Sequence, residues 1–261
     1  MSRARSHLSI PERFRGPARS GNGGWAAGSL AAEVVGAGDP TTIEVTLRRP
    51  PPLETVLTVL TFEHDEHDEP GGPAAVLALR GDPVAEAREV LDTLTPVDPV
   101  RAETAVAAMA AYPGLGSHPF PGCFACGPDR QEGDGLRIFP GAVALDTMAS
   151  GWVPHASLAE PGAVPAGGPD VERVGLPTTW AALDCVGGWA DDLAGRPMVL
   201  GRMTARVMTL PVVGEQHVVV GRRMRRDGRK SLTASSLYDA AGHLVGTAEH
   251  VWLTVDPGAF N

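Results

Sequence analysis

The chain has 261 residues, of which 43% are hydrophobic, and a formal net charge of −9 at pH 7. Its length fits one large domain or two small ones, and its acidity argues against a general binder of nucleic acids or anionic membranes. No run is long and apolar enough to cross a membrane, and the basic N-terminus lacks the apolar segment of a signal peptide. Three cysteines, an odd number, suit a reducing compartment. We therefore expect a cytoplasmic globular protein.

The first part of the chain is typical of one helix followed by four strands. Small residues dominate 21–34 and predict a helix. Apolar and β-branched residues then predict strands at 43–48, 56–62, 74–80 and 84–91. By propensity alone, the last of these runs is equally compatible with a helix. The acidic and histidine-rich run at 64–69 contains metal-ligand residue types, but the neighbouring Pro and Gly residues predict a solvated loop.

The second part repeats this order. Residues 113–141 are dense in glycine and proline and predict a connector that opens a new unit. A second helix rich in small residues is predicted over 177–190, and it is followed by strands at 199–209, 216–226, 231–239 and 244–255. Polar turns at Asp227-Gly228 and Ala241-Gly242 separate the last three strands, as hairpins require.

The two parts match in register. Three pairs of residues are each 161 positions apart (211 − 50 = 161): Pro50 and Pro211, Gly81 and Gly242, and Val84 and Val245. The helices align through Trp25 and Trp180 at an offset of 155 (180 − 25 = 155). One offset shared by several turn features predicts a duplication, with an N-terminal unit over 1–112 and a C-terminal unit over 113–261. It also favours a strand over a helix at 84–91.

A helix followed by antiparallel strands, duplicated in one chain, resembles the double hotdog architecture of thioesterase-like proteins. The stretch CFACGPDRQEGDGLRIF at 123–139 is similar to an opening common in that family. Residues 201–256 resemble its strand-rich half, and 21–32 with 46–59 resemble the first half of double-hotdog acyl-CoA thioesterases. The resemblance implies an α+β fold of two tandem hotdog units, with antiparallel sheets each wrapped around a central helix. It also implies hydrolysis of an acyl-CoA or related acyl thioester.

Two other functions remain open at this point. Hotdog proteins also include non-catalytic proteins that bind acyl groups or acyl-CoA. They include enoyl hydratases and dehydratases as well, which usually carry an Asp and a His a few residues apart. No His follows within a few residues of Asp184.

Asp184 is the main catalytic candidate, because it is the only charged residue between Val174 and Ala190. It lies four positions after Trp180, so both occupy one face of the predicted helix and both are candidate site residues. A buried carboxylate must be paired, protonated or facing a cavity. The resemblance implies that an acid on this helix activates water or attacks the thioester itself. The alternative is an acid that caps a loop or pairs with an arginine.

The starts of both helices are further candidates. Asn22, Gly23 and Gly24 open the first helix, where glycines admit a substrate close to the backbone and free amides can polarise a thioester carbonyl. The alternative is an ordinary N-cap formed by Asn22. Thr178 and Thr179 begin the second helix, where a hydroxyl caps the helix or binds the substrate carbonyl. The first helix carries no acid at the position matching Asp184, which is typical of a catalytically degenerate half.

The strand-rich end of the chain adds two groups. By the resemblance, His250 falls where a polar side chain positions the attacking water, although the family usually has an amide there; a hydrogen-bonded strand residue is the alternative. A basic cluster around one hairpin suits the phosphates of coenzyme A. Its members are Arg222, Arg223, Arg225, Arg226, Arg229 and Lys230. A solvated hairpin explains the cluster equally well.

The remaining motifs argue against cofactors. Cys123 and Cys126 form a CxxC pair, but a zinc site needs about four ligands and no second CxxC or HxxxH pair is present. GxSxG, Walker A and GxGxxG motifs are also missing. We expect no metal and no cofactor, with coenzyme A entering only as part of a small-molecule acyl thioester substrate. Neither nucleic acid nor membrane is an expected partner, and pairing through an edge strand would give a homo-oligomer of double-hotdog units.

Overall fold

The computed structural model describes residues 3–34, 40–62, 74–161 and 171–260. The predicted loop at 64–69 therefore lies outside the described residues. Within the described ranges, no helix has the length and apolar character needed to cross a membrane.

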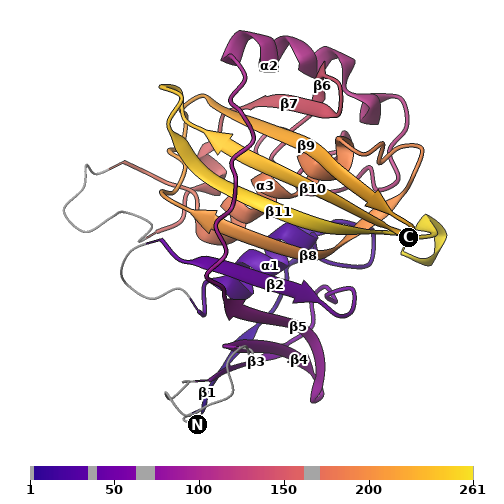
Figure 1. The fold of residues 1–261 in the computed structure, drawn as a ribbon. Helices are drawn as coiled ribbons and strands as arrows, with labels where there is room; N and C mark the ends of the chain where they lie inside the picture. Colours follow the sequence, from indigo (N-terminus) through magenta and orange to yellow (C-terminus); the bar gives the residue numbers. More distant parts are fainter. Residues whose placement is uncertain (1–2, 35–39, 63–73, 162–170, 261) are drawn as a thin grey trace.

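In the described part of the chain, one antiparallel sheet of eleven strands forms the body of the molecule (Figure 1). Its strands are β1 (Arg3–Leu8), β2 (Thr42–Leu47), β3 (Leu57–Phe62), β4 (Ala75–Leu79), β5 (Asp82–Glu89), β6 (Gly141–Ala144), β7 (Thr147–Trp152), β8 (Met198–Val207), β9 (His217–Asp227), β10 (Lys230–Tyr238) and β11 (Leu244–Thr254). Their spatial order is β1-β3-β4-β5-β2-β8-β11-β10-β9-β7-β6. The two expected sheets are thus continuous, because β2 pairs with β8 and places Val45 opposite Met203.

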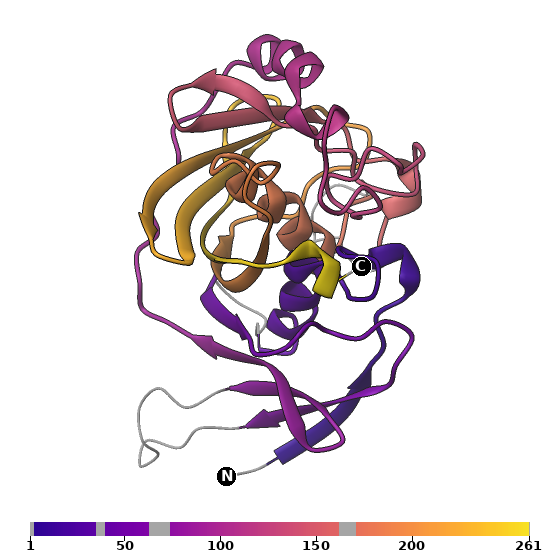
Figure 2. The same ribbon diagram turned by 90° about the vertical axis from the view of Figure 1, so that its right-hand side faces the viewer.

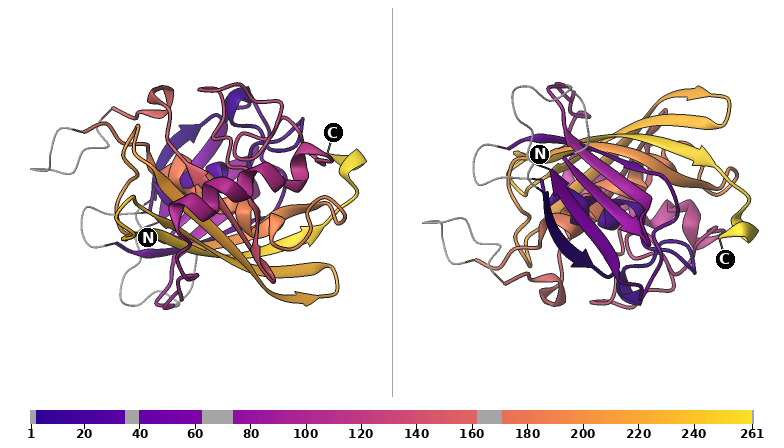
Figure 3. Two further views of the ribbon diagram at one scale, coloured as in Figure 1. Left: turned by 90° about the horizontal axis from the view of Figure 1, so that it is seen from above. Right: turned by 90° about the horizontal axis from the view of Figure 1, so that it is seen from below.

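Two helices, α1 (Gly23–Ala31) and α3 (Leu176–Trp189), lie side by side in the concavity of this sheet (Figures 2 and 3). Almost every residue of both helices is buried, as small and apolar residues permit. Glycines allow the close contact: a Cβ atom on Gly28 would lie 2.7 Å from the Cβ of Trp180 and 2.8 Å from the Cα of Pro177. The main hydrophobic core fills the space between these helices and the sheet.

The two halves repeat one topology. Counted inward from the outer flank, the first half orders its strands β1-β3-β4-β5-β2 and the second β7-β9-β10-β11-β8. The run at 84–91 is strand β5, as the repeat predicted. Gly81 and Gly242 occupy equivalent turns with φ of 93° and 84°, values that glycine adopts readily. β1, β6 and β7 were not predicted; β6 lies outside β7 and has no counterpart among the described strands of the first half.

A second layer covers the outer side of the C-terminal strands. After β5 the chain crosses this side in an extended conformation, where the Val97 N–H donates to Ser236 Oγ at 2.9 Å. It leads to α2 (Ala102–Ala108), which packs on β7 and β9 at the top of Figure 1. A small second core joins α2 to this outer side of the sheet. The predicted boundary after residue 112 therefore assigns α2 to the first unit, although its contacts are with strands of the second. Short 3₁₀ turns complete the structure at Glu12–Phe14, Met109–Ala111, Pro113–Leu115, Ala156–Leu158 and Pro257–Ala259.

Candidate active site

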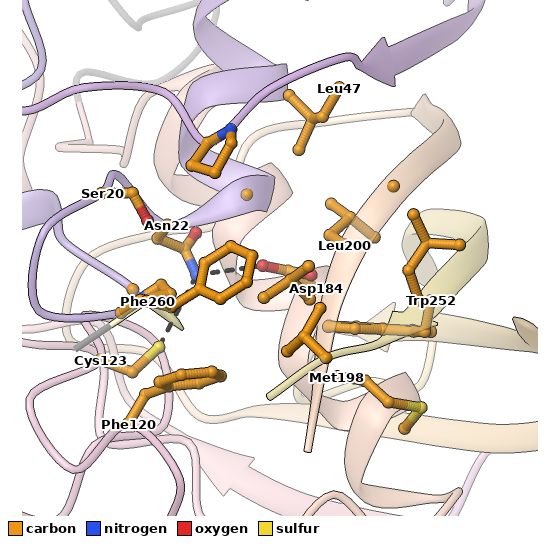
Figure 4. Close-up of a pocket in the computed structure, with 18 of the residues that line it drawn as sticks. Ser20, Asn22, Leu47, Phe120, Cys123, Asp184, Met198, Leu200, Trp252 and Phe260 are labelled. Carbon is orange, nitrogen blue, oxygen red and sulfur yellow. Dashed lines mark hydrogen bonds between the residues drawn. The ribbon is translucent and has the colours of Figure 1, made fainter. Parts of the chain in front are cut away.

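An apolar pocket opens where the two halves meet, beside the N-terminus of α1 (Figure 4). Its volume is roughly 970 Å³ with the open mouth included. The first half contributes residues 20–23 and 47–51, and the second contributes residues 198–201 and 252–253 together with part of α3. Apolar side chains line the pocket around Asp184 (Figure 4): Leu47, Met198, Leu200, Trp252 and Phe260. The pocket thus combines an apolar wall with one buried acid, the usual composition of a small-molecule site.

Asp184 lies on α3 with only 2% of its surface exposed. Its Oδ2 accepts hydrogen bonds from the Gly24 N–H at 2.9 Å and from Asn22 Nδ2 at 3.0 Å. Its Oδ1 is buried and has no hydrogen-bond partner among the described residues. Burial raises the pKa of Asp184 to about 7, although the hydrogen bond from Gly24 acts in the opposite direction. One carboxylate oxygen is therefore fixed by two donors, and the other accepts no hydrogen bond from the described residues.

The N-terminus of α1 provides the groups that hold Asp184. Asn22 is the N-cap: its Oδ1 accepts the Trp25 N–H at 2.8 Å while its Nδ2 donates to Asp184. Asn22 is thus the N-cap expected from the sequence as the alternative, and its side-chain amide also holds Asp184. A Cβ on Gly24 would lie 2.5 Å from the Cβ of Asp184, so only glycine fits. Gly23, at the first helical position, lines the pocket, and its N–H has no acceptor within the helix.

The corresponding site at the N-terminus of α3 lacks these groups. The two N-cap positions, Asn22 and Gly175, are 153 residues apart (175 − 22 = 153). This offset pairs each site residue with one that cannot replace it: Asn22 with Gly175, Gly24 with Pro177, and Asp184 with Ala31. Glycine has no side-chain amide, proline has no N–H and alanine has no carboxylate. The register also corrects the alignment of Trp25 with Trp180 by two residues, since the two tryptophans fill different spaces: Trp25 stacks on Phe14 at 4.2 Å, and Trp180 packs on Gly28.

Three cysteines line the same pocket. Cys123, Cys126 and Cys185 are buried and free, and their Sγ atoms lie within 4.8 Å of one another. His118, also at the pocket, places its Nε2 3.4 Å from Cys126 Sγ. Hydrogen bonds with Cys126 and Cys185 lower the pKa of the Cys123 thiol, whereas burial raises the pKa of Cys126. Sequence spacing shows the CxxC pair but not the approach of Cys185 and His118.

The other candidates on α3 lie closer to its N-terminus than Asp184 does. Thr179 Oγ1 donates to the Gly175 carbonyl at 3.0 Å, a helix-internal hydrogen bond. Thr178 and Trp180 are buried, and neither lines the pocket that contains Asp184. Thr178 and Thr179 are therefore not brought together with Asp184. Trp180 lies one turn before Asp184, and both residues pack against Gly24 of α1.

His250 also lies outside that pocket. Its Nδ1 is 3.2 Å from Thr233 Oγ1, and its ring packs beside Gly187 of α3. Burial lowers the pKa of His250 to about 4, so the ring is neutral near pH 7. The arrangement is that of a buried strand residue with a hydrogen bond.

The predicted arginine cluster is divided between β9 and the β9–β10 turn. On β9, Arg223 pairs with Asp146 and with Asp191, and neither Arg222 nor Arg225 lines the pocket. Arg229, in the turn, does line it. The pocket is also lined by Arg48 and Arg49, just after β2, which were not predicted.

No protein-family model matches the chain, and no curated protein matches it by sequence. Solved structures do match over nearly its full length. A tesB protein from Mycobacterium avium subs paratuberculosis is 12% identical with a TM-score of 0.58, covering 97% of this chain and 93% of that one. A conserved protein of unknown function with a hot dog fold from Alicyclobacillus acidocaldarius is 12% identical with a TM-score of 0.59, covering 97% and 94%. An acyl-CoA thioesterase II, TesB2, from Mycobacterium marinum is 10% identical with a TM-score of 0.56, covering 98% and 94%. With its duplicated helix-and-sheet topology, the chain has the double hotdog fold that its repeat predicted.

Proposed function

We propose that the chain hydrolyses an acyl thioester, with Asp184 as the general base. The observation that carries this proposal is the Asp184 carboxylate itself. It is buried in the wall of an apolar pocket, held at Oδ2 by Asn22 and Gly24, and unpartnered at Oδ1 among the described residues. A purely structural carboxylate at this depth is expected to use both oxygens. The free cysteines suit action in the cytoplasm.

In the proposed reaction, Asp184 activates a water molecule and the N-terminus of α1 binds the oxyanion. A water molecule held by Asp184 Oδ1 loses a proton to the carboxylate as its oxygen bonds to the thioester carbon. The oxyanion that forms accepts a hydrogen bond from the Gly23 N–H, at the positive end of the α1 dipole. The tetrahedral intermediate then breaks its C–S bond, and the departing thiolate takes the proton from Asp184. The products are a carboxylic acid and a free thiol.

Coenzyme A is the proposed thiol portion of the substrate. Arg48, Arg49 and Arg229 line the pocket and are suited to phosphate groups. Arg48 and Arg49 pair with the partly exposed Glu86 and Asp82 at 2.7 and 3.2 Å. Exposed pairs of this kind contribute only about 0–1 kcal/mol, so a phosphate can compete for both arginines.

Release of free thiol across a panel of acyl-CoA chain lengths tests the activity, and Asp184→Asn tests the assignment. The asparagine retains the shape and can still accept at its oxygen, so the fold should persist while kcat falls on the order of 10²–10⁴-fold. KM should change little, since the loss is in the transition state.

Asp191→Asn is the matched control. Asp191 is an equally buried acid, but it pairs with Arg196, Arg223 and Arg226, so this change should lower the melting temperature and leave kcat per folded molecule intact. Full activity of a folded Asp184→Asn variant would refute the catalytic assignment. An inactive wild-type chain that still binds acyl-CoA would favour an acyl-binding protein.

A further inference from the structure

The proposed hydrolysis uses none of the three thiols in the pocket. They come from two separate parts of the chain, Cys123 and Cys126 from the connector after α2, and Cys185 from α3. The Sγ atoms of Cys123 and Cys185 are 3.8 Å apart, and all three sulfurs lie within 4.8 Å of one another. A disulfide requires about 2.05 Å, so this spacing is not that of a bonded pair. Two thiolates bound tetrahedrally to one zinc ion, each at about 2.3 Å, are about 3.8 Å apart.

The loop that carries the CxxC pair is folded so that its two sulfurs converge. The backbone N–H of Cys126 donates to the Cys123 sulfur, and the Gly127 N–H donates to the Cys123 carbonyl at 2.8 Å. A Cβ on Gly127 would lie 2.5 Å from both the N and the O of Cys123, so the turn requires glycine. This compact C-x-x-C-G turn presents both sulfurs to a single point, as the cysteine pairs of zinc sites do.

Hydrogen-bond donors surround the cluster. Asn22 Nδ2 lies 3.7 Å from Cys123 Sγ and 3.9 Å from Cys185 Sγ. His118 Nδ1 accepts the Phe120 N–H at 2.9 Å, so its Nε2 carries the proton and donates to Cys126 Sγ. Groups that donate to the sulfurs stabilise thiolates, and such partners are typical around metal ligands.

We propose that Cys123, Cys126 and Cys185 bind one zinc ion through their three sulfurs. His118 donates a hydrogen bond to the Cys126 thiolate and is not a ligand. The fourth coordination position faces the pocket, because all three sulfurs line it. Binding displaces the protons of those cysteines that are still thiols and leaves the oxidation state of sulfur unchanged. The proposal replaces the expectation of a metal-free chain and does not depend on thioester hydrolysis.

Metal content tests this directly. The full chain, produced without a polyhistidine tag, should contain one zinc ion per molecule by elemental mass spectrometry. Replacement by Co²⁺ should give the thiolate-to-cobalt absorption in the near ultraviolet and the strong visible bands of a four-coordinate ion. Cys185→Ser should lower the zinc content at least tenfold, whereas His118→Ala should retain one zinc per chain.

A measurement on the unaltered chain removes any dependence on how a variant folds. Titration with an organomercurial reagent should release zinc to a chromogenic chelator in step with modification of three thiols. A zinc-free chain that takes up no Co²⁺ would overturn the proposal, as would full zinc retention in folded Cys185→Ser. Loss of zinc from His118→Ala as complete as from Cys185→Ser would overturn the three-sulfur ligand set. None of these readouts requires enzymatic activity, so a failure here is separable from a failure of the proposed hydrolysis.

Discussion

Asn22 has two simultaneous roles, since its side chain caps α1 through Oδ1 and holds Asp184 through Nδ2. Asn22→Ala removes both hydrogen bonds. We expect it to cost about 1 kcal/mol of stability from the lost cap and to lower kcat by roughly tenfold or more, because Asp184 loses one of its two fixed donors.

Asn22→Ser separates these effects, because serine is a good N-cap residue but has no amide to donate to Asp184. Its unfolding free energy should stay close to that of the wild type while its kcat falls as in the alanine variant. Urea denaturation and thiol release measured on both variants check this expectation. A serine variant with wild-type kcat would show that the hydrogen bond from Asn22 does not position the carboxylate.

The sequence identifies part of the site at this scale. Asp184 is conspicuous as the one charge in an uncharged helix, and Asn22 with two glycines marks a helix start. Cys185 offers no comparable signal, because its neighbour Cys123 is 62 residues away along the chain. Thr178 and Thr179 have suitable residue types, but the antiparallel packing of the helices places them at the wrong end of α3.

The contact between α1 and α3 depends on glycine at its closest point. Gly28→Ala introduces a Cβ within 2.8 Å of both Trp180 and Pro177, neither of which can move freely inside the core. Overpacking of this kind typically costs about 1–3 kcal/mol. Chemical denaturation should show this loss. Gly116→Ala is the control, because its nearest contact would be 3.6 Å away and its φ of −91° suits alanine; a similar loss in both variants would contradict the packing explanation.

The arginines that line the pocket and those on β9 can be compared through their effects on the KM for acyl-CoA. Neutralising Arg48, Arg49 and Arg229 to glutamine should raise the KM for acyl-CoA several-fold at low salt. The effect should shrink as salt screens exposed charges. Neutralising Arg222 and Arg225 on β9 should leave KM unchanged, since neither lines the pocket. The reverse pattern in steady-state kinetics would place the phosphate site on β9 instead.

The repeat predicted the four strands that follow each helix, because their turn residues recur at one constant offset along the chain. It did not predict β1, β6 and β7. β1 carries basic and polar residues and, among the described strands, pairs only with β3. β6 and β7 lie in or beside segments whose Gly and Pro content indicates turns. Strands of this kind are fixed by the neighbouring strand rather than by their own composition.

For the molecule as a whole, the burial of neutral His250 makes stability depend on pH. Its pKa is lowered to about 4 in the folded chain by burial, against about 6.5 for an exposed histidine. Above pH 6.5 both states carry a neutral ring and the contribution is complete. As the pH falls from about 6.5 to 4 the unfolded chain takes up the proton first, so stability is lost, by roughly 3 kcal/mol at most.

Denaturant unfolding at pH 7, 6 and 5 measures this loss. His250→Gln should flatten that part of the stability profile, whereas His243→Gln, at an exposed position, should leave it as in the wild type. An identical slope in wild type and His250→Gln would assign the acid sensitivity to other groups.

The carboxylate and the donors that hold it belong to opposite halves of one polypeptide. In a symmetric homodimer of single units, one gene would specify two such sites, and every substitution would alter both at once. When the two units are joined in a single chain, a substitution alters only one of the two sites. Pro177 and Ala31 can therefore remove the second site without any effect on the first. The N-terminal end of α3 can then change under selection for packing alone. One consequence is testable by recombination: two separately produced halves should regain hydrolysis only when mixed, since neither fragment encodes a complete site.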